Sequence, residues 1–255
     1  MDLGLHGKVA MIAGGSAGLG LATARALAAE GAKVSIAGRD PQRLASAVEQ
    51  LQTDGAGTVM GRALDVRDDA AVGQWVADTV AEFGALHIVV ANAGGPPVGS
   101  ATELTAKDYR DALELNLTSS IVLCEQTVPH LRKAGWGRYL FITSMSAKIP
   151  APRLALSNVT RAGVLGYAKS LMYDVAKDGI TVNVLAPGFT RTARFEQVFS
   201  TPEQQEKLAA EQIPLGRVAD PAEFAAVATF LASQPAGYVT GTVMQIDGGW
   251  AGSLY

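Results

Sequence analysis

The sequence AGGSAGLG, residues 13–20, carries the main evidence for the fold class. It directly follows the apolar run KVAMIAG, which begins at Lys8, and it opens a segment with helical spacing of apolar residues. Glycines at such a turn let the backbone approach a pyrophosphate, whose charge is met by the N–H groups of the helix N-terminus. A merely tight strand-to-helix turn is the alternative. From this position we expect a dinucleotide site that contains Gly14, Ser16, Gly18, Leu19 and Gly20.

Six further strand-like runs follow, and most are separated by segments with a helical pattern. They begin at Ala32, Thr58, His87, Arg138, Thr181 and Thr242. Asp40-Pro41 and Thr105 supply helix starts between them. This rhythm is typical of βαβ units, in which helices cover both faces of a parallel sheet. The sequence therefore predicts an α/β protein with one Rossmann-type, doubly wound domain over residues 1–255 and a seven-stranded parallel sheet.

Composition narrows the kind of partner. The chain has 255 residues and a net charge of −3, without a run of Lys or Arg, so we expect no nucleic-acid or membrane partner. Its single cysteine, Cys124, cannot form an internal disulfide, and no Cys/His spacing indicates a metal site. The N-terminus lacks a signal-peptide pattern, and no apolar run is long enough to span a membrane. We expect a cytoplasmic protein that acts on a small molecule.

One irregular insertion separates the last two strand runs. It covers about residues 188–217, and its apolar and charged character is mixed. Long excursions beyond strand C-termini usually cover a ligand, so we expect this segment to cover the substrate.

The glycine spacing is G-x-x-x-G-x-G, and with it the chain resembles the short-chain dehydrogenase/reductase family. The resemblance extends over nearly the whole chain, through LDV from Leu64, NAGG from Asn92, LNL from Leu115, ITS from Ile142, VNVLAPGFTRT from Val182, PLGR from Pro214, YVTG from Tyr238 and DGG from Asp247. Ala13 departs from the threonine of many members. SNVTRAG, residues 157–163, and NAGGPP further resemble a sub-branch labelled 3-oxoacyl-carrier-protein-reductase-like.

The resemblance implies an NAD(P)(H) site. Asp65 and Val66 would flank the adenine, while a second group would line the cleft and hold the nicotinamide: Asn92, Ala93, Gly94, Pro187, Gly188, Thr190 and Thr192. A turn cap at Asn92 and an ordinary loop hydroxyl at Thr192 are the alternatives.

The second strand run ends in IAGRD, and its last residues bear on the choice of cofactor. An acidic residue there would bind the ribose 2′-OH, whereas the guanidinium of Arg39 can bind a 2′-phosphate bidentately. Asp40 could serve as the ribose ligand, but its place before Pro41 gives it a helix-capping role. We expect NADP(H) in preference to NAD(H).

Family members that transfer hydride use a serine, a tyrosine about 13 residues later, a lysine four residues beyond it, and an asparagine on the preceding helix. Ser144 and Asn116 match the serine and the asparagine. The same counts from Ser144 reach Ser157 and Arg161, so the tyrosine and lysine are replaced. Arg161 can still bind the ribose, but it stays protonated, and the hydroxyl of Ser157 is a poor general acid.

Two other Tyr/Lys pairs do not fit these roles. Tyr173 and Lys177 have the spacing Y-x-x-x-K, but Tyr173 lies 16 residues beyond Ser157. On one helix that is a displacement of roughly 24 Å. Tyr167 and Lys169 are two residues apart, so they point in different directions.

The sequence does not identify the proton donor. Lys148 lies in the segment expected to form the substrate wall and becomes a candidate if it is partly desolvated. Ser146, or a water relayed through Ser157, is equally possible, and Arg153 could bind an anionic substrate group.

Three functions compete. The first is an NADP(H)-dependent carbonyl reductase or alcohol dehydrogenase with a substituted acid/base pair. The second is a non-redox lyase or isomerase in the same cleft, and the third is a cofactor-binding protein without turnover. The C-terminal segment resembles the family's tetramer-forming end, so we expect a homo-oligomer, a dimer or a tetramer.

Overall fold

The sheet has seven strands, as the sequence predicts. The computed structural model describes residues 1–54 and 57–252. All strand pairs are parallel, in the order β3-β2-β1-β4-β5-β6-β7. Within the described ranges the strands are β1 Val9–Ile12, β2 Lys33–Gly38, β3 Val59–Ala63, β4 Ile88–Ala91, β5 Gly137–Ile142, β6 Ile180–Pro187 and β7 Val243–Ile246. The predicted α/β, doubly wound Rossmann class is confirmed.

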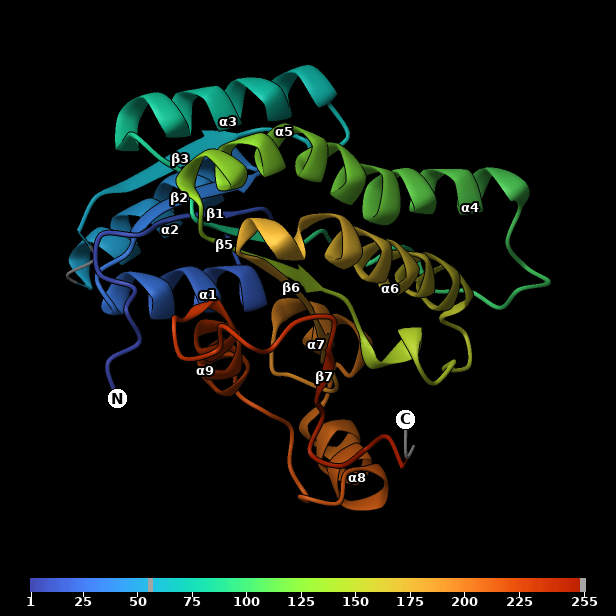
Figure 1. Cartoon of the computed structure of the whole chain (residues 1–255). Coiled ribbons are helices and arrows are strands. Elements are labelled where there is room, and N and C mark those ends of the chain that lie inside the picture. Colours follow the sequence, from blue (N-terminus) through green and yellow to red (C-terminus); the bar gives the residue numbers. More distant parts are fainter. Residues whose placement is uncertain (55–56, 253–255) are drawn as a thin grey trace.

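Helices cover both faces of this sheet (Figure 1). One apolar cluster joins the sheet to α3 (Asp69–Phe83), α5 (Ser119–Ala134) and α6 (Ala155–Val175). The other joins the opposite face to α1 (Gly18–Ala29), α2 (Pro41–Thr53) and α9 (Pro221–Ala232). Strands β1, β4, β5 and β6 are buried along their whole length, which explains why they read as unbroken apolar runs.

Two predicted helix starts are confirmed by their caps. The Asp40 carboxylate accepts hydrogen bonds from the backbone N–H groups of Gln42 and Arg43, at 3.0 and 3.1 Å. Thr105 and Asp108 form a reciprocal capping box at the start of α4 (Ala106–Leu113). A π-helical turn, Glu114–Thr118, then joins α4 to α5.

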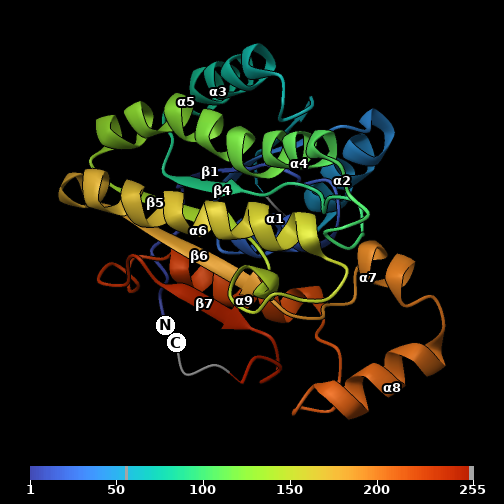
Figure 2. The ribbon, with the colours of Figure 1, turned by 90° about the vertical axis from the view of Figure 1, so that its right-hand side faces the viewer.

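The insertion between β6 and β7 folds into α7 (Ala193–Val198) and α8 (Pro202–Gln212). Both helices project from the side of the sheet–helix body (Figure 2). Phe189, Phe195 and Phe199 pack against one another in a small apolar cluster of their own, with ring centroids 5.1–6.3 Å apart. The segment is therefore held by a local core at the carboxyl end of β6.

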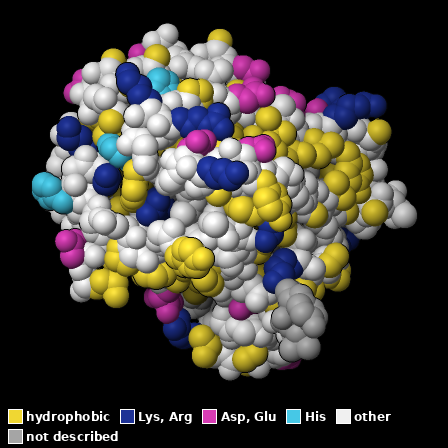
Figure 3. All heavy atoms as spheres, viewed as in Figure 1, with side chains coloured by type: hydrophobic (Ala, Val, Ile, Leu, Met, Phe, Trp, Pro, Cys, Tyr) yellow, Lys and Arg dark blue, Asp and Glu magenta, His cyan; other side chains and the backbone are white. Residues whose placement is uncertain are grey.

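The surface shown in Figure 3 carries scattered charges. Lys and Arg side chains alternate with acidic and apolar ones and do not merge into one basic patch on this face. In the described part of the chain, no helix is long and apolar enough to cross a membrane.

Candidate active site

The glycine turn lies where the strand order reverses, between β1 and β4. A Cβ atom at Gly20 would lie 2.2 Å from the carbonyl oxygen of Gly14, and Gly14 and Gly18 have φ values of +58° and +54°. Only glycine meets these conditions without strain. The N-cap of α1, Ala17, supplies no side-chain hydrogen bond. The N-terminal N–H groups of α1 are therefore left without a side-chain acceptor at the cap, next to a backbone cradle.

Residues that follow β4 and β6 contact this turn, and the residues directly after β6 and β7 contact each other. The side-chain amide of Asn92, after β4, donates to the Gly14 carbonyl oxygen over 3.3 Å. The side chain of Thr192, after β6, lies 3.5 Å from the position a Cβ atom would take at Gly18. Gly188 packs against Asp247, since a Cβ atom there would lie 2.7 Å from the Asp247 Cβ. The fold thus gathers the predicted cofactor loops at one edge of the sheet.

The end of β2 presents a second polar group. The Ser16 hydroxyl would lie 2.5 Å from a Cβ atom at Gly38, so it packs directly on that residue. Arg39 follows, exposed, with its guanidinium 3.8 Å from the Cβ position of Gly94. Asp65, after β3, accepts two hydrogen bonds from the Arg67 guanidinium, at 2.6 and 3.1 Å, and these hold the pKa of Asp65 below its usual range. The Asp65 carboxylate is therefore already paired with the Arg67 guanidinium.

Three serines form a connected group after β5. The Ser144 hydroxyl oxygen accepts the backbone N–H of Ser146 over 3.2 Å. The Ser146 and Ser157 hydroxyls are 2.9 Å apart and hydrogen-bonded. Ser146 is 3 % exposed, so this bond is shielded from bulk water. The pair joins the loop after β5 to the first turn of α6.

Arg161 lies one turn further along α6 and is buried. Its guanidinium donates to the carbonyl oxygens of Ile142, at 2.8 Å, and Ala93, at 3.4 Å. Its Nε atom is buried without a hydrogen-bond partner among the described residues. Burial lowers the pKa of Arg161 to about 10, so the side chain stays a cation at neutral pH. It links the carboxyl ends of β4 and β5.

Asn116 lies in the π-helical turn and is 2 % exposed. Its side-chain amide donates to the Gly94 carbonyl oxygen over 3.1 Å, and its Oδ1 atom accepts the Thr160 hydroxyl over 3.2 Å. Single-turn π-helices often occur at functional sites. Here the turn directs Asn116 toward the Gly94 loop and α6 together.

Lys148 and Arg153 lie on the loop between β5 and α6. Lys148 is partly buried, and its side chain makes no hydrogen bond or ion pair with any described residue. Arg153 is exposed at φ +60° and lies 3.9 Å from Glu103. Asn158 braces this loop through two hydrogen bonds to the Ala151 backbone.

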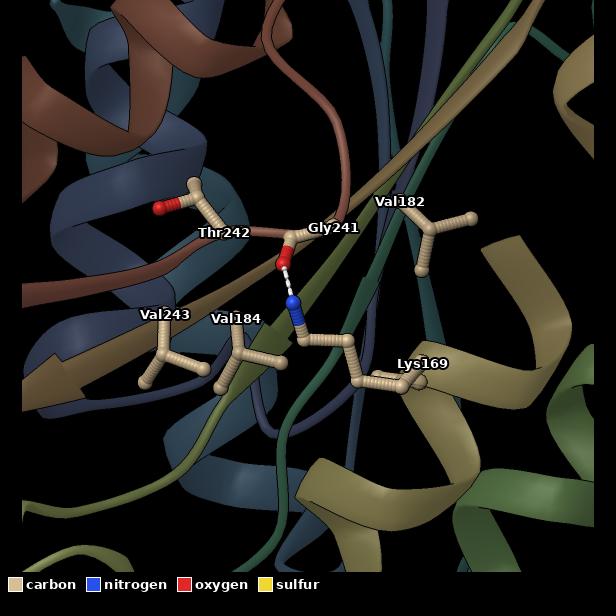
Figure 4. Close-up of a pocket in the computed structure, with 7 residues that line it drawn as sticks. Lys169, Val182, Val184, Gly241, Thr242 and Val243 are labelled. Atoms are coloured by element: carbon tan, nitrogen blue, oxygen red, sulfur yellow. Dashed lines mark hydrogen bonds between the residues drawn. The ribbon is translucent and has the colours of Figure 1, made fainter. Parts of the chain in front are cut away.

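The other Tyr/Lys pairs lie elsewhere. Tyr173 is 79 % exposed near the C-terminal end of α6, and Lys177 follows that helix. Tyr167 is half-buried against Phe141. Lys169 donates to the Gly241 carbonyl beside Val182 and Val184 of β6 (Figure 4). In the described part of the chain, none of the four makes a hydrogen bond or ring contact with Ser144, Ser157 or Arg161.

Sequence reasoning left Thr160 and Arg194 without a role. Thr160 is three residues after Ser157 on the same helix, a spacing that could have indicated a shared face. Arg194 crosses from α7 and donates to the Pro96 carbonyl oxygen over 3.0 Å. No sequence signal marks it, because the contact joins segments 98 residues apart.

The strand order, together with a glycine turn at its reversal point, defines a dinucleotide-binding protein of the Rossmann class. The family model described as enoyl-(acyl carrier protein) reductase matches residues 13–251. The chain is 33% identical over 247 residues to the 3-oxoacyl-[acyl-carrier-protein] reductase of Vibrio cholerae, covering 97% of this chain and 98% of that protein. It is 32% identical over 251 residues to human dehydrogenase/reductase SDR family member 4, covering 96% and 88%.

A solved structure gives the same result. L-sorbose reductase from Gluconobacter frateurii, complexed with NADPH and L-sorbose, superposes with a TM-score of 0.95 at 31% identity and 100% coverage of both chains. The chain belongs to the short-chain dehydrogenase/reductase family. It is thus an oxidoreductase of the NAD(P)H-dependent kind.

Proposed function

We propose that this chain is an NADP(H)-dependent carbonyl reductase or alcohol dehydrogenase in which Ser157 and Arg161 replace the family's tyrosine and lysine. The observation that carries the proposal is the serine group beside Arg161. Ser144, Ser146 and Ser157 are connected by hydrogen bonds at the same sheet edge as the glycine turn. The group supplies hydroxyl donors where a substrate carbonyl would lie.

The described residues fit an NAD(P)(H) molecule. The glycine turn is a backbone cradle that side chains would fill, and the Arg161 Nε and Thr190 Oγ1 atoms are buried without partners among the described residues. We assign the diphosphate to Gly14, Ser16, Gly18, Leu19 and Gly20. We assign adenine binding and the cleft wall to Asp65, Val66, Asn92, Ala93 and Gly94. Arg161 would bind the ribose. The nicotinamide would contact Pro187, Gly188, Thr190 and Thr192.

Arg39 and Ser16 support NADP(H) over NAD(H). Arg39 follows β2, and Ser16 of the glycine turn packs on Gly38 at the end of that strand. The fixed charge and fork of donors of Arg39 suit a phosphate. Arg39→Ala should lower the preference for NADPH over NADH in kcat/KM by about 10- to 100-fold, the value of one charge-assisted hydrogen bond or two. An unchanged ratio would refute the assignment.

In the reaction the bound cofactor supplies or accepts the hydride. Ser144 donates a hydrogen bond to the substrate oxygen, because its own oxygen already accepts the Ser146 N–H and its proton is free. Ser146 and Ser157 hold a water that delivers the proton, or Lys148 delivers it. Asn116 fixes the Gly94 loop beside the cleft. Without the tyrosine a general acid worth about 10²- to 10⁴-fold is missing, so turnover should be slow.

The proton donor can be separated by mutation. If Lys148→Ala loses turnover and Ser157→Ala keeps it, Lys148 is the proton donor. If both variants keep turnover, water is the proton donor. Ser157→Tyr combined with Arg161→Lys should raise ketone reduction if the cleft still suits the family's mechanism.

The overall test has two parts. Fluorescence titration measures NADPH binding, and consumption of NADPH is then assayed against a broad ketone panel. Binding without oxidation by any ketone would remove the reductase and leave a lyase, an isomerase or a protein without turnover.

We further propose that residues 188–217 cover the substrate and that the chain forms a homo-oligomer. The first is supported by the position of α7 across the glycine turn. The second is supported by two exposed aromatic side chains, the partly exposed Phe230 of α9 and the fully exposed Tyr238 between α9 and β7. Light scattering on the purified protein tests the oligomer.

A further inference from the structure

Two arginines converge on consecutive glycines of the loop after β4. Arg39 comes from the end of β2, and its Nη2 atom is 3.8 Å from the Cβ position of Gly94. Arg194 comes from α7, and its Nε atom is 3.4 Å from the Cβ position of Gly95. Two guanidinium groups from separate elements therefore flank one short stretch of backbone.

Neither guanidinium is ion-paired within the described residues, although Asp65, which is bound to Arg67, interacts with Arg39 at longer range. No carboxylate of residues 1–54 or 57–252 forms an ion pair with Arg39 or Arg194. Arg194 uses one of its five N–H donors on the Pro96 carbonyl, which carries no net charge. Two cations beside the same loop gain free energy when anionic groups bind next to them. The arrangement indicates a site for two anionic groups.

The start of α7 fixes which anion Arg194 faces. Thr192 packs against Gly18, so α7 begins directly over the glycine turn and the N-terminus of α1, whose N-cap residue gives no side-chain hydrogen bond. Arg194, two residues on, shares that neighbourhood. Arg39 lies on the other side, next to Ser16 and Gly38.

We propose that Arg194 is a cofactor-binding residue that closes α7 over the cofactor's diphosphate, while Arg39 binds the 2′-phosphate. This inference rests on the proposed function, since it presupposes NADP(H) in the cleft. It adds a residue from the insertion to the cofactor site. The insertion would then contact the cofactor as well as cover the substrate.

Two cofactor fragments separate the two arginines. ADP-ribose carries the diphosphate without a 2′-phosphate, and 2′-AMP carries the 2′-phosphate without a diphosphate. Calorimetric titration of Arg194→Ala should show about 10- to 100-fold weaker binding of ADP-ribose and NADPH, the loss of one or two charge-assisted hydrogen bonds. Its affinity for 2′-AMP should stay at the wild-type value. Arg39→Ala should bind 2′-AMP more weakly than wild type and should bind ADP-ribose with the wild-type affinity.

Arg191→Ala is the matched control, because Arg191 is an exposed arginine of the same segment. Among residues 1–54 and 57–252, only its backbone N–H forms a hydrogen bond, to Ala219. It removes the same charge and should bind ADP-ribose like wild type. Arg194→Lys should retain part of the affinity.

Equal effects of Arg194→Ala and Arg191→Ala on ADP-ribose would overturn the inference and leave the proposed function standing. So would unchanged cofactor binding in Arg194→Ala together with a raised KM for carboxylate-bearing ketones, since Arg194 would then bind substrate. A wild-type protein that binds neither NADPH nor ADP-ribose would instead refute the proposed function itself.

Discussion

Replacement of the buried Arg161 should affect cofactor binding and folding stability differently. Its guanidinium is a cation on a side chain only 7 % exposed, and it donates to two backbone carbonyls. Desolvation of an unpaired charge opposes the gain from such hydrogen bonds. Its hydrogen bonds join the ends of β4 and β5, and its Nε, unpartnered among the described residues, belongs to the side chain that we propose binds the ribose.

Arg161→Met should consequently fold with a melting temperature close to wild type, because the lost hydrogen bonds and the relieved desolvation offset each other. Its Kd for NADPH should rise by about 10-fold, the value of roughly one hydrogen bond. Thermal melts and fluorescence titration measure the two quantities. Wild-type NADPH affinity in this variant would argue against a ribose contact.

His87 makes a second prediction at the scale of one side chain. Its Nδ1 atom accepts the Val9 backbone N–H over 3.1 Å, so the ring must be neutral at that nitrogen. Burial, and then the nearby Lys8, lower the pKa of His87. The unfolded chain, with a pKa of about 6.5, then binds more protons than the folded chain in mild acid.

The stabilising contribution of neutral His87 is therefore complete above about pH 6.5 and is lost as the pH falls through the lower folded pKa. Urea unfolding from pH 7.5 to pH 5 should show this decline. His87→Asn keeps an acceptor but cannot be protonated, so its unfolding free energy should fall less over that range. The exposed His6→Asn serves as control and should follow wild type.

At the scale of the element, the start of α2 decides between two roles for Asp40. The carboxylate already accepts two backbone N–H groups of the helix. Asp40→Ala should lower the unfolding free energy by about 1 kcal/mol, the usual value of an N-cap. Asp40→Asn should restore most of it, because asparagine caps equally well.

Neither Asp40 variant should change the ratio of NADPH to NADH affinity. A selective loss of NADH binding in Asp40→Ala would instead make Asp40 a ribose ligand. Urea unfolding and cofactor titration on the same preparations distinguish the two roles.

At the scale of the whole molecule, the cofactor loops belong to strands that are far apart in the sequence and adjacent in the sheet. A ligand that contacts the ends of β1, β2, β4 and β6 binds only the folded chain. NADPH at 100 times its Kd should therefore stabilise the protein by about 2.7 kcal/mol, which corresponds to a rise in melting temperature of about 5 to 10 °C. NADH at the same concentration should give a smaller rise. Equal shifts would contradict the NADP(H) assignment.

Much of this architecture could be predicted from the sequence. The seven strand runs and the glycine turn carry local signals, namely β-branched apolar residues and a spacing that only a strand-to-helix turn requires. The caps at Asp40 and Thr105 are equally local. Ser157 and Arg161 could be placed on one helical face because they are four residues apart.

The remaining parts depend on contacts between distant segments. Three contacts join segments that only the folded sheet brings together. They are the hydrogen bond between Ser146 and Ser157, the hydrogen bonds of Arg161 to the ends of β4 and β5, and the approach of Arg194 to Gly95. The π-helical turn that aims Asn116 has no marker of its own. The class of fold, and the sheet edge at which we propose the site, could be read from the sequence because they follow from local periodicity. The tertiary structure alone decided which donors are buried, which are already used and which are free to bind a ligand, because these depend on packing.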